Sequence, residues 1–167
     1  MQTGTHIAHA DSGEPLEAVR ELMREYIAWT MTFFGDPESA PTFHNIDREL
    51  QELPGVYAPP RGRLLLATHD GKPAGCVALK PIDRTTCELK RLYVRPDFRG
   101  HRIGNQLVAK LMEEARKEGY TQMVLDSHRT MTAAHHIYRS SGFHDVETPA
   151  DFPEQLKPEV VFMECAL

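Results

Sequence analysis

The sequence has few of the features that mark membrane, secreted or nucleic-acid-binding proteins. No apolar run approaches the length needed to span a membrane, and the polar N-terminus does not resemble a signal peptide. Acidic side chains outnumber basic ones, 24 to 19, and the net charge of −5 argues against a surface that generally attracts nucleic acid or membranes. We therefore expect a cytoplasmic protein with no nucleic-acid partner and no membrane partner.

Cysteine is also scarce. The three cysteines, Cys76, Cys87 and Cys165, lie in apolar, strand-like runs without a paired spacing, which indicates buried, reduced thiols. Nine histidines are present, but His135 and His136 are adjacent on an expected helix and so point in different directions. No Cys–His spacing recurs, and we expect no metal site.

The length of 167 residues suits one domain with a proper core, and we expect residues 1–167 to form a single domain. The spacing of apolar residues predicts a helix that starts near residues 11–15 and ends near Gly35-Asp36-Pro37, followed by a short helix over 46–53. Strands are expected over the following ranges: 5–9, 64–68, 74–79 and 86–94. Asp70-Gly71 between the second and third of these predicts a hairpin.

The second half of the chain alternates between helix and strand. A helix is expected after Gly104, ending at Gly119, and another over 132–141. Strands are expected over the following ranges: 122–125, 143–146 and 160–165. A crossover helix between Val94 and Met123 makes that strand pair parallel. The fold class is therefore α/β, of the α+β type, with a mixed, mostly antiparallel central sheet flanked by helices.

The segment 91–107 contains a strand end, a turn at Pro96-Asp97 and the start of a helix. A helix N-terminus carries unpaired N–H donors and a partial positive charge, so it can bind phosphate. Gly100 and Gly104 keep the backbone approachable there. Three side chains add positive charge: Arg99, His101 and Arg102. The segment predicts a pyrophosphate cradle, and the alternative is an ordinary βα turn with solvated basic residues.

This order of elements, with Arg99-Gly100-His101-Arg102-Ile103-Gly104 at its centre, resembles the GCN5-related N-acetyltransferase (GNAT) superfamily. The acetyl-CoA signature of that family is Arg/Gln-x-x-Gly-x-Gly/Ala, entered from a strand that ends Leu-x-Val-x-Pro, and Leu92-Tyr93-Val94-Arg95-Pro96 matches the strand end. A second family element reads Asn-x-x-Ala-x-x-x-Tyr-x-x-x-Gly-Phe. Four residues match it at the right spacing: Ala134, Tyr138, Gly142 and Phe143.

The resemblance implies an enzyme that uses acetyl-CoA, with the pyrophosphate on the backbone of residues 99–104. It also implies that pantetheine runs beside the preceding strand, and that an N–H near Val94 polarises the thioester carbonyl. The residues that the resemblance assigns to cofactor binding are Leu92, Tyr93, Val94, Arg99, Gly100, His101, Arg102, Ile103, Gly104, Met131, Ala134 and Tyr138.

Two residues depart from the family pattern. Arg102 stands where the family favours glycine, and we expect a negative φ there, in the first helical turn, so that the backbone does not demand glycine. Met131 stands in place of the usual asparagine. Since a thioether cannot supply the hydrogen bonds of an amide, only apolar contact with pantetheine is expected from Met131.

The resemblance also suggests the groups that move protons. Tyr138 matches the usual general acid, and a core aromatic residue is the alternative. Glu88 stands where family members often place a base, which would act through water or with a raised pKa; it could equally form an ion pair with Lys90 or Arg91. His128 is the second candidate for the base.

The acceptor is expected to be a primary amine of a small or amino-acid-like molecule that attacks the thioester directly in a ternary complex. A protein N-terminus or lysine is one alternative, and a non-catalytic acyl-CoA sensor is another. Either Lys90 or Arg91 binds an acidic group of the acceptor, or both face solvent. Family members are often dimers, so a homodimer is a possible assembly. Further candidates near the acceptor or the phosphate are Phe33, Phe34, Tyr57, Arg61 and Arg139.

Overall fold

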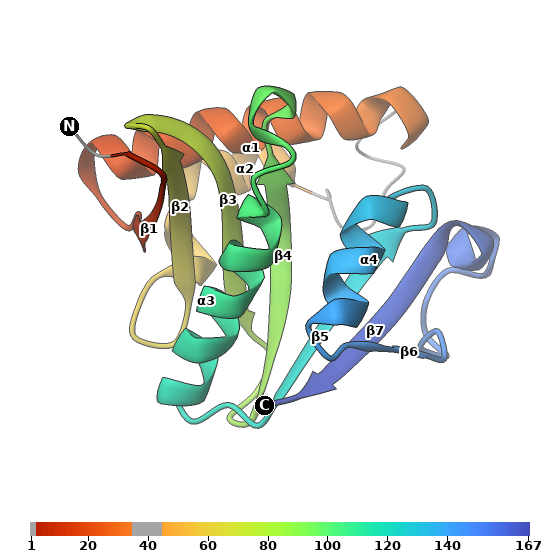
Figure 1. Cartoon of the computed structure of the whole chain (residues 1–167). Helices are drawn as coiled ribbons and strands as arrows, with labels where there is room; N and C mark the ends of the chain where they lie inside the picture. Colours follow the sequence, from red (N-terminus) through yellow and green to blue (C-terminus); the bar gives the residue numbers. More distant parts are fainter. Residues whose placement is uncertain (1–2, 35–44) are drawn as a thin grey trace.

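Seven strands form one sheet in the computed structural model, which describes residues 3–34 and 45–167. In chain order the strands are β1 (Thr5–His9), β2 (Arg63–His69), β3 (Lys72–Pro81), β4 (Thr86–Val94), β5 (Gln122–His128), β6 (His144–Val146) and β7 (Val160–Ala166). Their order across the sheet is β1-β2-β3-β4-β5-β7-β6 (Figure 1). Only the β4–β5 pair is parallel among these strands, as the crossover predicts.

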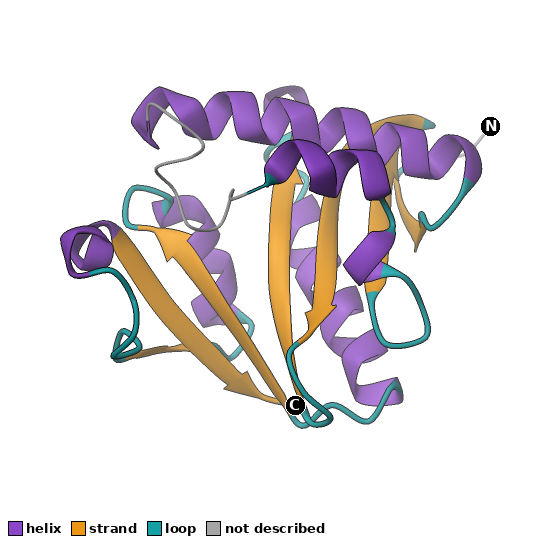
Figure 2. Cartoon of the chain, turned by 180° about the vertical axis from the view of Figure 1, so that it is seen from behind, coloured by secondary structure: helices purple, strands orange, loops and turns teal. Residues whose placement is uncertain are grey.

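Helices cover both faces of this sheet (Figure 2). The α-helices are α1 (Gly13–Phe34), α2 (Ile46–Glu52), α3 (Ile103–Lys117) and α4 (Thr132–Ser140). Short 3-10 turns that the sequence did not predict are η3 (Gly55–Tyr57), η4 (Pro96–Phe98) and η5 (Glu154–Glu159).

 The predicted helices and strands are all present, and β4 has the predicted bounds. The expected end of the first helix near Gly35-Asp36-Pro37 lies outside the described residues. No helix in the described ranges combines the length and apolar character that a membrane crossing requires.

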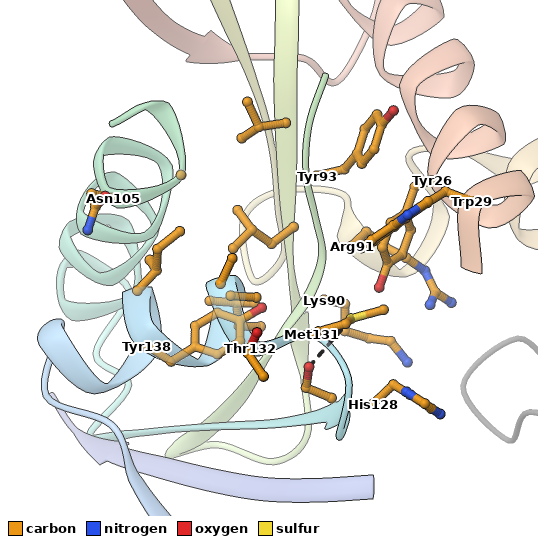
Figure 3. A pocket seen from close by; sticks show the side chains of 18 of the residues that line it. Tyr26, Trp29, Lys90, Arg91, Tyr93, Asn105, His128, Met131, Thr132 and Tyr138 are labelled. Atoms are coloured by element: carbon orange, nitrogen blue, oxygen red, sulfur yellow. Dashed lines mark hydrogen bonds between the residues drawn. The ribbon is translucent and has the colours of Figure 1, made fainter. Parts of the chain in front are cut away.

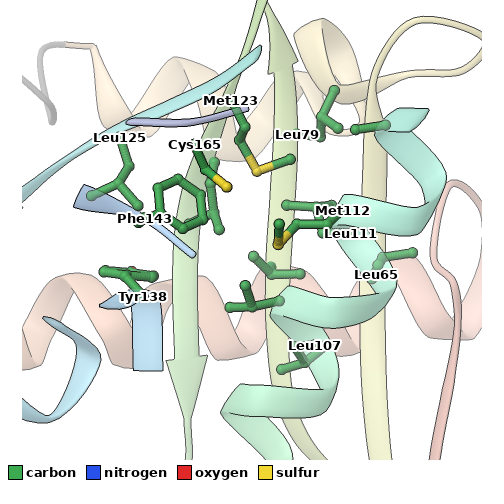
Figure 4. Close-up of a cluster of buried hydrophobic side chains, with 14 of the residues drawn as sticks. Leu65, Leu79, Leu107, Leu111, Met112, Met123, Leu125, Tyr138, Phe143 and Cys165 are labelled. Carbon is green, nitrogen blue, oxygen red and sulfur yellow. The ribbon is translucent and has the colours of Figure 1, made fainter. Parts of the chain in front are cut away.

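The two faces of the sheet bury separate apolar cores. On one face, α3 and α4 pack over alternate strand residues such as Leu89 and Leu125, together with Tyr138 and Phe143 (Figure 4). On the other face, α1 and α2 cover the residues in between, which include Tyr93. Side chains of a strand alternate between faces, so this division fixes which face every residue of β4 and β5 presents. All three cysteines are buried and unpaired, as predicted.

The β4–β5 pair opens part-way along its length. Residues 86–88 of β4 pair with residues 122–124 of β5, and the register ends at Glu88 and Val124. Beyond this point β5 continues to pair with β7, while β4 continues to pair with β3. The edge of β4 from Leu89 onward therefore lacks a strand partner on the β5 side, and Figure 2 shows the two halves of the sheet diverging.

A β-bulge in β4 changes which side chains share a face. Ala78 of β3 pairs with Lys90 and Cys76 pairs with Tyr93, so two residues of β4 stand opposite one residue of β3. Arg91 absorbs the extra residue with φ of 60°, a left-handed conformation. As a result Lys90 and Arg91 both face α1 and α2, although they are adjacent in the sequence.

Candidate functional site

A cavity of about 500 Å³ occupies the opening between β4 and β5. It runs between the start of α3 and α4 on one side and α1 on the other; Figure 3 shows Tyr138 of α4 and Trp29 of α1 on opposite sides of β4. Residues predicted to bind the cofactor that line it are Leu92, Tyr93, Val94, Arg99, Gly100, Arg102, Ile103, Gly104, Met131, Ala134 and Tyr138. His101 is not among the lining residues, and its ring lies 4.3 Å from the ring of His69.

The turn before α3 presents a row of backbone donors. The N–H groups of residues 100–105 have no hydrogen-bond acceptor within the described part of the chain, and no side chain caps the helix. Gly100 supports the turn with φ of 91°. Unpaired N–H groups at a helix start suit a phosphate oxygen in both geometry and charge. The segment thus fits a pyrophosphate, as the sequence predicts.

The expectation of a negative φ at Arg102 is wrong. Arg102 is the N-cap of α3 and has φ of 58° and ψ of 29°, in the left-handed region. Its side chain is exposed, so no packing holds it in this conformation. Any residue with a Cβ, alanine included, is disfavoured there, because Cβ approaches the following carbonyl oxygen. The backbone therefore does favour glycine at this position, in agreement with the family pattern.

We expect Arg102→Gly to stabilise the protein by about 1 kcal/mol relative to Arg102→Ala, because glycine adopts this φ without strain. Denaturant unfolding of the two variants measures the difference. Neither variant keeps the guanidinium, so the comparison isolates the backbone. Equal stability of the two variants would contradict the strain at this position.

Gly104 has a packing role that the sequence did not reveal. A Cβ at Gly104 would lie 2.7 Å from Cδ1 of Ile137, which belongs to α4. A side chain at this position would require the end of the Ile137 side chain to shift. The absent side chain of Gly104 therefore serves the contact with Ile137 as well as the approach of a ligand.

The free edge of β4 presents main-chain groups to the cavity. The N–H of Arg95 donates to the carbonyl oxygen of Ala74 on β3, at 2.8 Å. Because successive N–H groups of a strand point to opposite sides, the N–H of Val94 points away from β3 and toward the cavity. This donor and the unpartnered edge before it suit an extended ligand that binds like an added strand.

Tyr138 lies where α4 meets the cavity. Its ring is buried, 5.8 Å from the ring of Phe143, and its hydroxyl has no hydrogen bond to the described residues. Burial raises the pKa of Tyr138 well above its ordinary value, so the phenol is protonated at neutral pH. The structure therefore combines both interpretations of this residue: the ring belongs to the core and the side chain also lines the cavity.

Ser127 is a polar residue of the cavity that sequence reasoning missed. Its hydroxyl lies 3.6 Å from Sδ of Met131 and 3.0 Å from Nε2 of the buried His135. Met131 itself is at the N-cap of α4, as its place in the motif implies. Ser127 therefore supplies a hydroxyl beside the position where the thioether offers only apolar contact.

Charged groups gather where β4 and β5 separate, on the face covered by α1. Glu88 does not line the cavity, whereas Lys90, Arg91 and Asp126 do. Burial raises the pKa of Glu88, which the charge of Lys90 partly offsets and the charge of Asp126 reinforces. Burial, and then the charge of Arg91, lower the pKa of Lys90. The charges of Glu88, Lys90, Arg91 and Asp126 therefore influence one another across the separating strands.

Arg91 does not face solvent, so the alternative that Lys90 and Arg91 both face solvent is wrong. It is only 5% exposed and donates two hydrogen bonds to the Glu49 carboxylate, at 2.9 and 3.0 Å. This pair joins α2 to the bulge of β4. No spacing in the sequence connects two residues 42 positions apart, so sequence reasoning could not find it.

Both ring nitrogens of His128 are engaged. Nδ1 accepts a hydrogen bond from the N–H of Thr130 at 3.2 Å, which places the proton of the neutral ring on Nε2, 3.4 Å from the Glu159 carboxylate. Burial is the main cause that lowers the pKa of His128. The arrangement favours a neutral imidazole that is held in place at the cavity wall, and His128 stays the second candidate for the base beside Glu88.

Aromatic rings of α1 form a row along the same side of the cavity. Centroid distances are 5.9 Å from Tyr93 to Tyr26, 6.2 Å from Tyr26 to Trp29 and 5.4 Å from Trp29 to Phe33. Phe33 continues the row to His128 at 4.7 Å but is not among the residues that line the cavity, so its predicted place near the acceptor stays a prediction. The side chain of Phe34 lies outside the described part. Helical spacing signals this row in the sequence, but equally signals core packing.

Three other candidates lie away from the cavity. Tyr57 is fully buried in the core beneath α1 and α2. Arg61 donates to the carbonyl oxygens of Asp83 and Arg84 and stacks on a tyrosine ring. Arg139 pairs with Asp145 at 3.0 Å. None of the three lines the cavity, so their predicted roles at the acceptor or the phosphate are wrong.

Comparison with known proteins finds relatives among the acetyltransferases. Residues 19–143 match the model of the acetyltransferase (GNAT) family. An uncharacterized N-acetyltransferase of Schizosaccharomyces pombe is 41% identical over 124 residues, which cover 73% of this chain and 74% of that protein. The uncharacterized N-acetyltransferase YsnE of Bacillus subtilis is 31% identical over 147 residues, covering 87% of this chain and 89% of YsnE. The crystal structure of the PaiA N-acetyltransferase of Thermoplasma acidophilum in complex with coenzyme A superposes with a TM-score of 0.75 at 23% identity, covering 99% and 100% of the two chains.

Proposed function

This chain belongs to the GNAT acetyltransferase family and is an acetyl-CoA-dependent N-acetyltransferase, and we propose that its acceptor is the primary amine of a small, amino-acid-like molecule. In this proposal the amine attacks the thioester directly in a ternary complex. The observation that carries it is the continuity of one cavity, from the N–H donors before α3 to the charged and aromatic face beneath α1. Both substrates can be bound there at the same time.

Acetyl-CoA supplies an acetyl group activated as a thioester. The N–H donors of residues 100–105 and the positive end of α3 would hold its pyrophosphate. The edge of β4 would align the pantetheine arm by main-chain hydrogen bonds. The N–H of Val94 would donate to the thioester carbonyl oxygen, where negative charge develops as the amine attacks.

Two side chains would move protons in this proposal. The new bond forms between the amine nitrogen and the acetyl carbon, and the bond from that carbon to sulfur breaks. Tyr138 would donate its hydroxyl proton to the departing sulfur. Glu88 would accept a proton from the amine through an ordered water, because it stands behind the cavity lining; its raised pKa brings its basicity closer to that of the amine.

Release of the coenzyme A thiol during incubation with a panel of primary amines tests the proposal. We expect release with small amines, and acetylation of the amine in equal amount. Turnover confined to peptide N-termini or to protein lysine would favour the protein-acetylating alternative. Binding of acetyl-CoA without release on any amine would favour the sensor and overturn the proposal.

The pH dependence tests Glu88. A base works only when deprotonated, so kcat/KM should rise with pH through the pKa of Glu88, at a higher pH than an ordinary carboxylate because burial raises that pKa. Glu88→Gln should remove this limb and lower kcat/KM by about 100-fold. The exposed Glu147→Gln is the matched control and should leave the profile unchanged. Loss of the limb in His128→Gln, with Glu88→Gln unaffected, would assign the base to His128 instead.

A further inference from the structure

Lys90 is a cation of the cavity wall that has no direct polar contact with residues 3–34 or 45–167. It makes no hydrogen bond or ion pair with the described residues, in contrast to its neighbour Arg91, whose charge faces Glu49. The bulge turns both cations to one face, and burial lowers the pKa of Lys90. A partly buried ammonium that lacks a direct ion pair costs free energy. The charges of Glu88, Asp126 and Glu49 offset part of this cost, and an anionic ligand in direct contact would offset more.

Asp126 supplies the opposite charge on the neighbouring strand. Lys90 and Asp126 stand two residues beyond the last paired residues, Glu88 and Val124, and so share the face beneath α1. Both line the cavity, yet they form no ion pair with each other. The strands diverge here, and the space between the two charges suits a ligand with one charge of each sign. An ammonium and a carboxylate on one carbon have this arrangement.

The aromatic row of α1 adds an apolar wall. Trp29 lines the cavity and remains 40% exposed, so its ring has surface that a ligand can cover. Tyr26 lies beside it, and the Arg99 guanidinium stands 5.9 Å from the indole at the other rim. An aromatic or large apolar side chain would bury surface against this wall and would meet rings at ordinary stacking distance.

We propose that the acceptor is an α-amino acid with an aromatic or large apolar side chain, whose carboxylate binds Lys90 and whose ammonium is received near Asp126. The inference rests on the proposed acetyl transfer and names the substrate class of the same cavity. Lys90 would act as a specificity residue, since it contacts the carboxylate and not the reacting atoms. Asp126 would hold the ammonium before the amine loses its proton.

The test compares L-phenylalanine with L-phenylalaninamide, which lacks the carboxylate charge, using kcat/KM for thiol release. The wild-type protein should prefer the acid by on the order of 10- to 100-fold, the usual range for a charge-assisted hydrogen bond. The amine of the amide is less basic, so more of it is neutral at a given pH. This bias works against the expected preference and makes a positive result stronger.

Lys90→Met should remove the preference by lowering kcat/KM for phenylalanine far more than that for the amide, and any effect on the pKa of Glu88 should change both substrates alike, so the ratio of the two values is the readout. Lys90→Arg should retain it, which shows that the charge and not the fold is responsible. Lys72→Met, on an exposed hairpin residue, is the matched control and should behave as wild type. Trp29→Ala should lower kcat/KM more for phenylalanine than for alanine.

Equal use of the acid and the amide by the wild-type protein would overturn the inference, and so would a preference that persists in Lys90→Met. Both of these results leave the proposed function standing, because thiol is still released with a small amine. Absence of thiol release with every amine would overturn the proposed function and this inference with it.

Discussion

Replacing Tyr138 with phenylalanine should lower kcat by about 100-fold and leave the KM for acetyl-CoA nearly unchanged. The phenylalanine ring fills the same space against Phe143, so the core and the cavity wall keep their shape. The hydroxyl alone is lost, and it makes no hydrogen bond to the described residues that the fold would miss. A proton donor acts as the sulfur departs, so its removal affects the transition state and not the binding of the ground state.

Tyr120→Phe is the matched control for this prediction. The Tyr120 hydroxyl donates to the carbonyl oxygen of Arg61 at 2.8 Å, away from the cavity, so its removal should cost about 1 kcal/mol of stability and no activity. Steady-state kinetics and thermal unfolding of both variants separate the two effects. An unchanged kcat in Tyr138→Phe would remove the residue from the chemistry, and a loss of stability equal to that of Tyr120→Phe would assign it a structural role.

Local patterns in the sequence were sufficient for the secondary structure and for most of the residues that line the cavity near α3 and α4. The strand that ends at Val94, the glycine turn and the start of α3 are contiguous in the chain, so their geometry follows from neighbouring residues. The motif on α4 likewise places Tyr138 and Ala134 on one helix face, four residues apart. The crossover helix between Val94 and Met123 predicted the parallel β4–β5 pair, and the two segments meet where this pair opens.

The proposed acceptor half of the site depends on contacts that no local pattern encodes. The bulge that turns Lys90 and Arg91 to one face arises from the register between β3 and β4, and strict alternation would have separated them. Asp126 stands level with Lys90 because β5 pairs in parallel with β4 in this register. Trp29 is recognisable as part of a helix, but its place at the cavity depends on how α1 crosses the sheet.

The left-handed residues show a second limit. Arg91 and Arg102 both have positive φ, and neither has the short polar side chain that commonly signals this conformation. At Arg102 the turn into α3 imposes the positive φ, and the strain energy of this conformation stays local to the turn. At Arg91 the angle is tied to a buried charge, so its cost is coupled to the pairing with α2.

Glu49→Gln should therefore lower the free energy of unfolding by about 3–5 kcal/mol, the usual cost of removing one member of a buried ion pair. The Arg91 guanidinium would keep its buried position and lose the negative charge that faces it through two hydrogen bonds. Glu52→Gln is the matched control on the same helix. Glu52 pairs with Arg48 in an exposed position, and its substitution should change stability by less than about 0.5 kcal/mol.

The pH dependence of unfolding gives an independent readout of the same pair. Burial alone would raise the pKa of Glu49, but the hydrogen bonds and charge of Arg91 hold it below its ordinary value. A lowered folded-state pKa gives stability that is present above the unfolded pKa and is lost as the pH falls through the folded pKa. The wild-type protein should lose this part of its stability in acid, while Glu49→Gln should not.

The double variant Glu49→Gln/Arg91→Met, compared with Glu49→Gln and Arg91→Met alone, distinguishes a buried charge from a lost contact. If the cost of Glu49→Gln comes from the buried guanidinium, removal of both charges should destabilise the protein by less than the sum of the single substitutions. Additive losses would contradict this. Glu49→Gln should also weaken the preference for phenylalanine over its amide, because the pair holds the bulge that turns Lys90 toward the cavity. A destabilised variant with an unchanged preference would show that the bulge keeps its shape without the pair, and that the role of Arg91 is confined to stability.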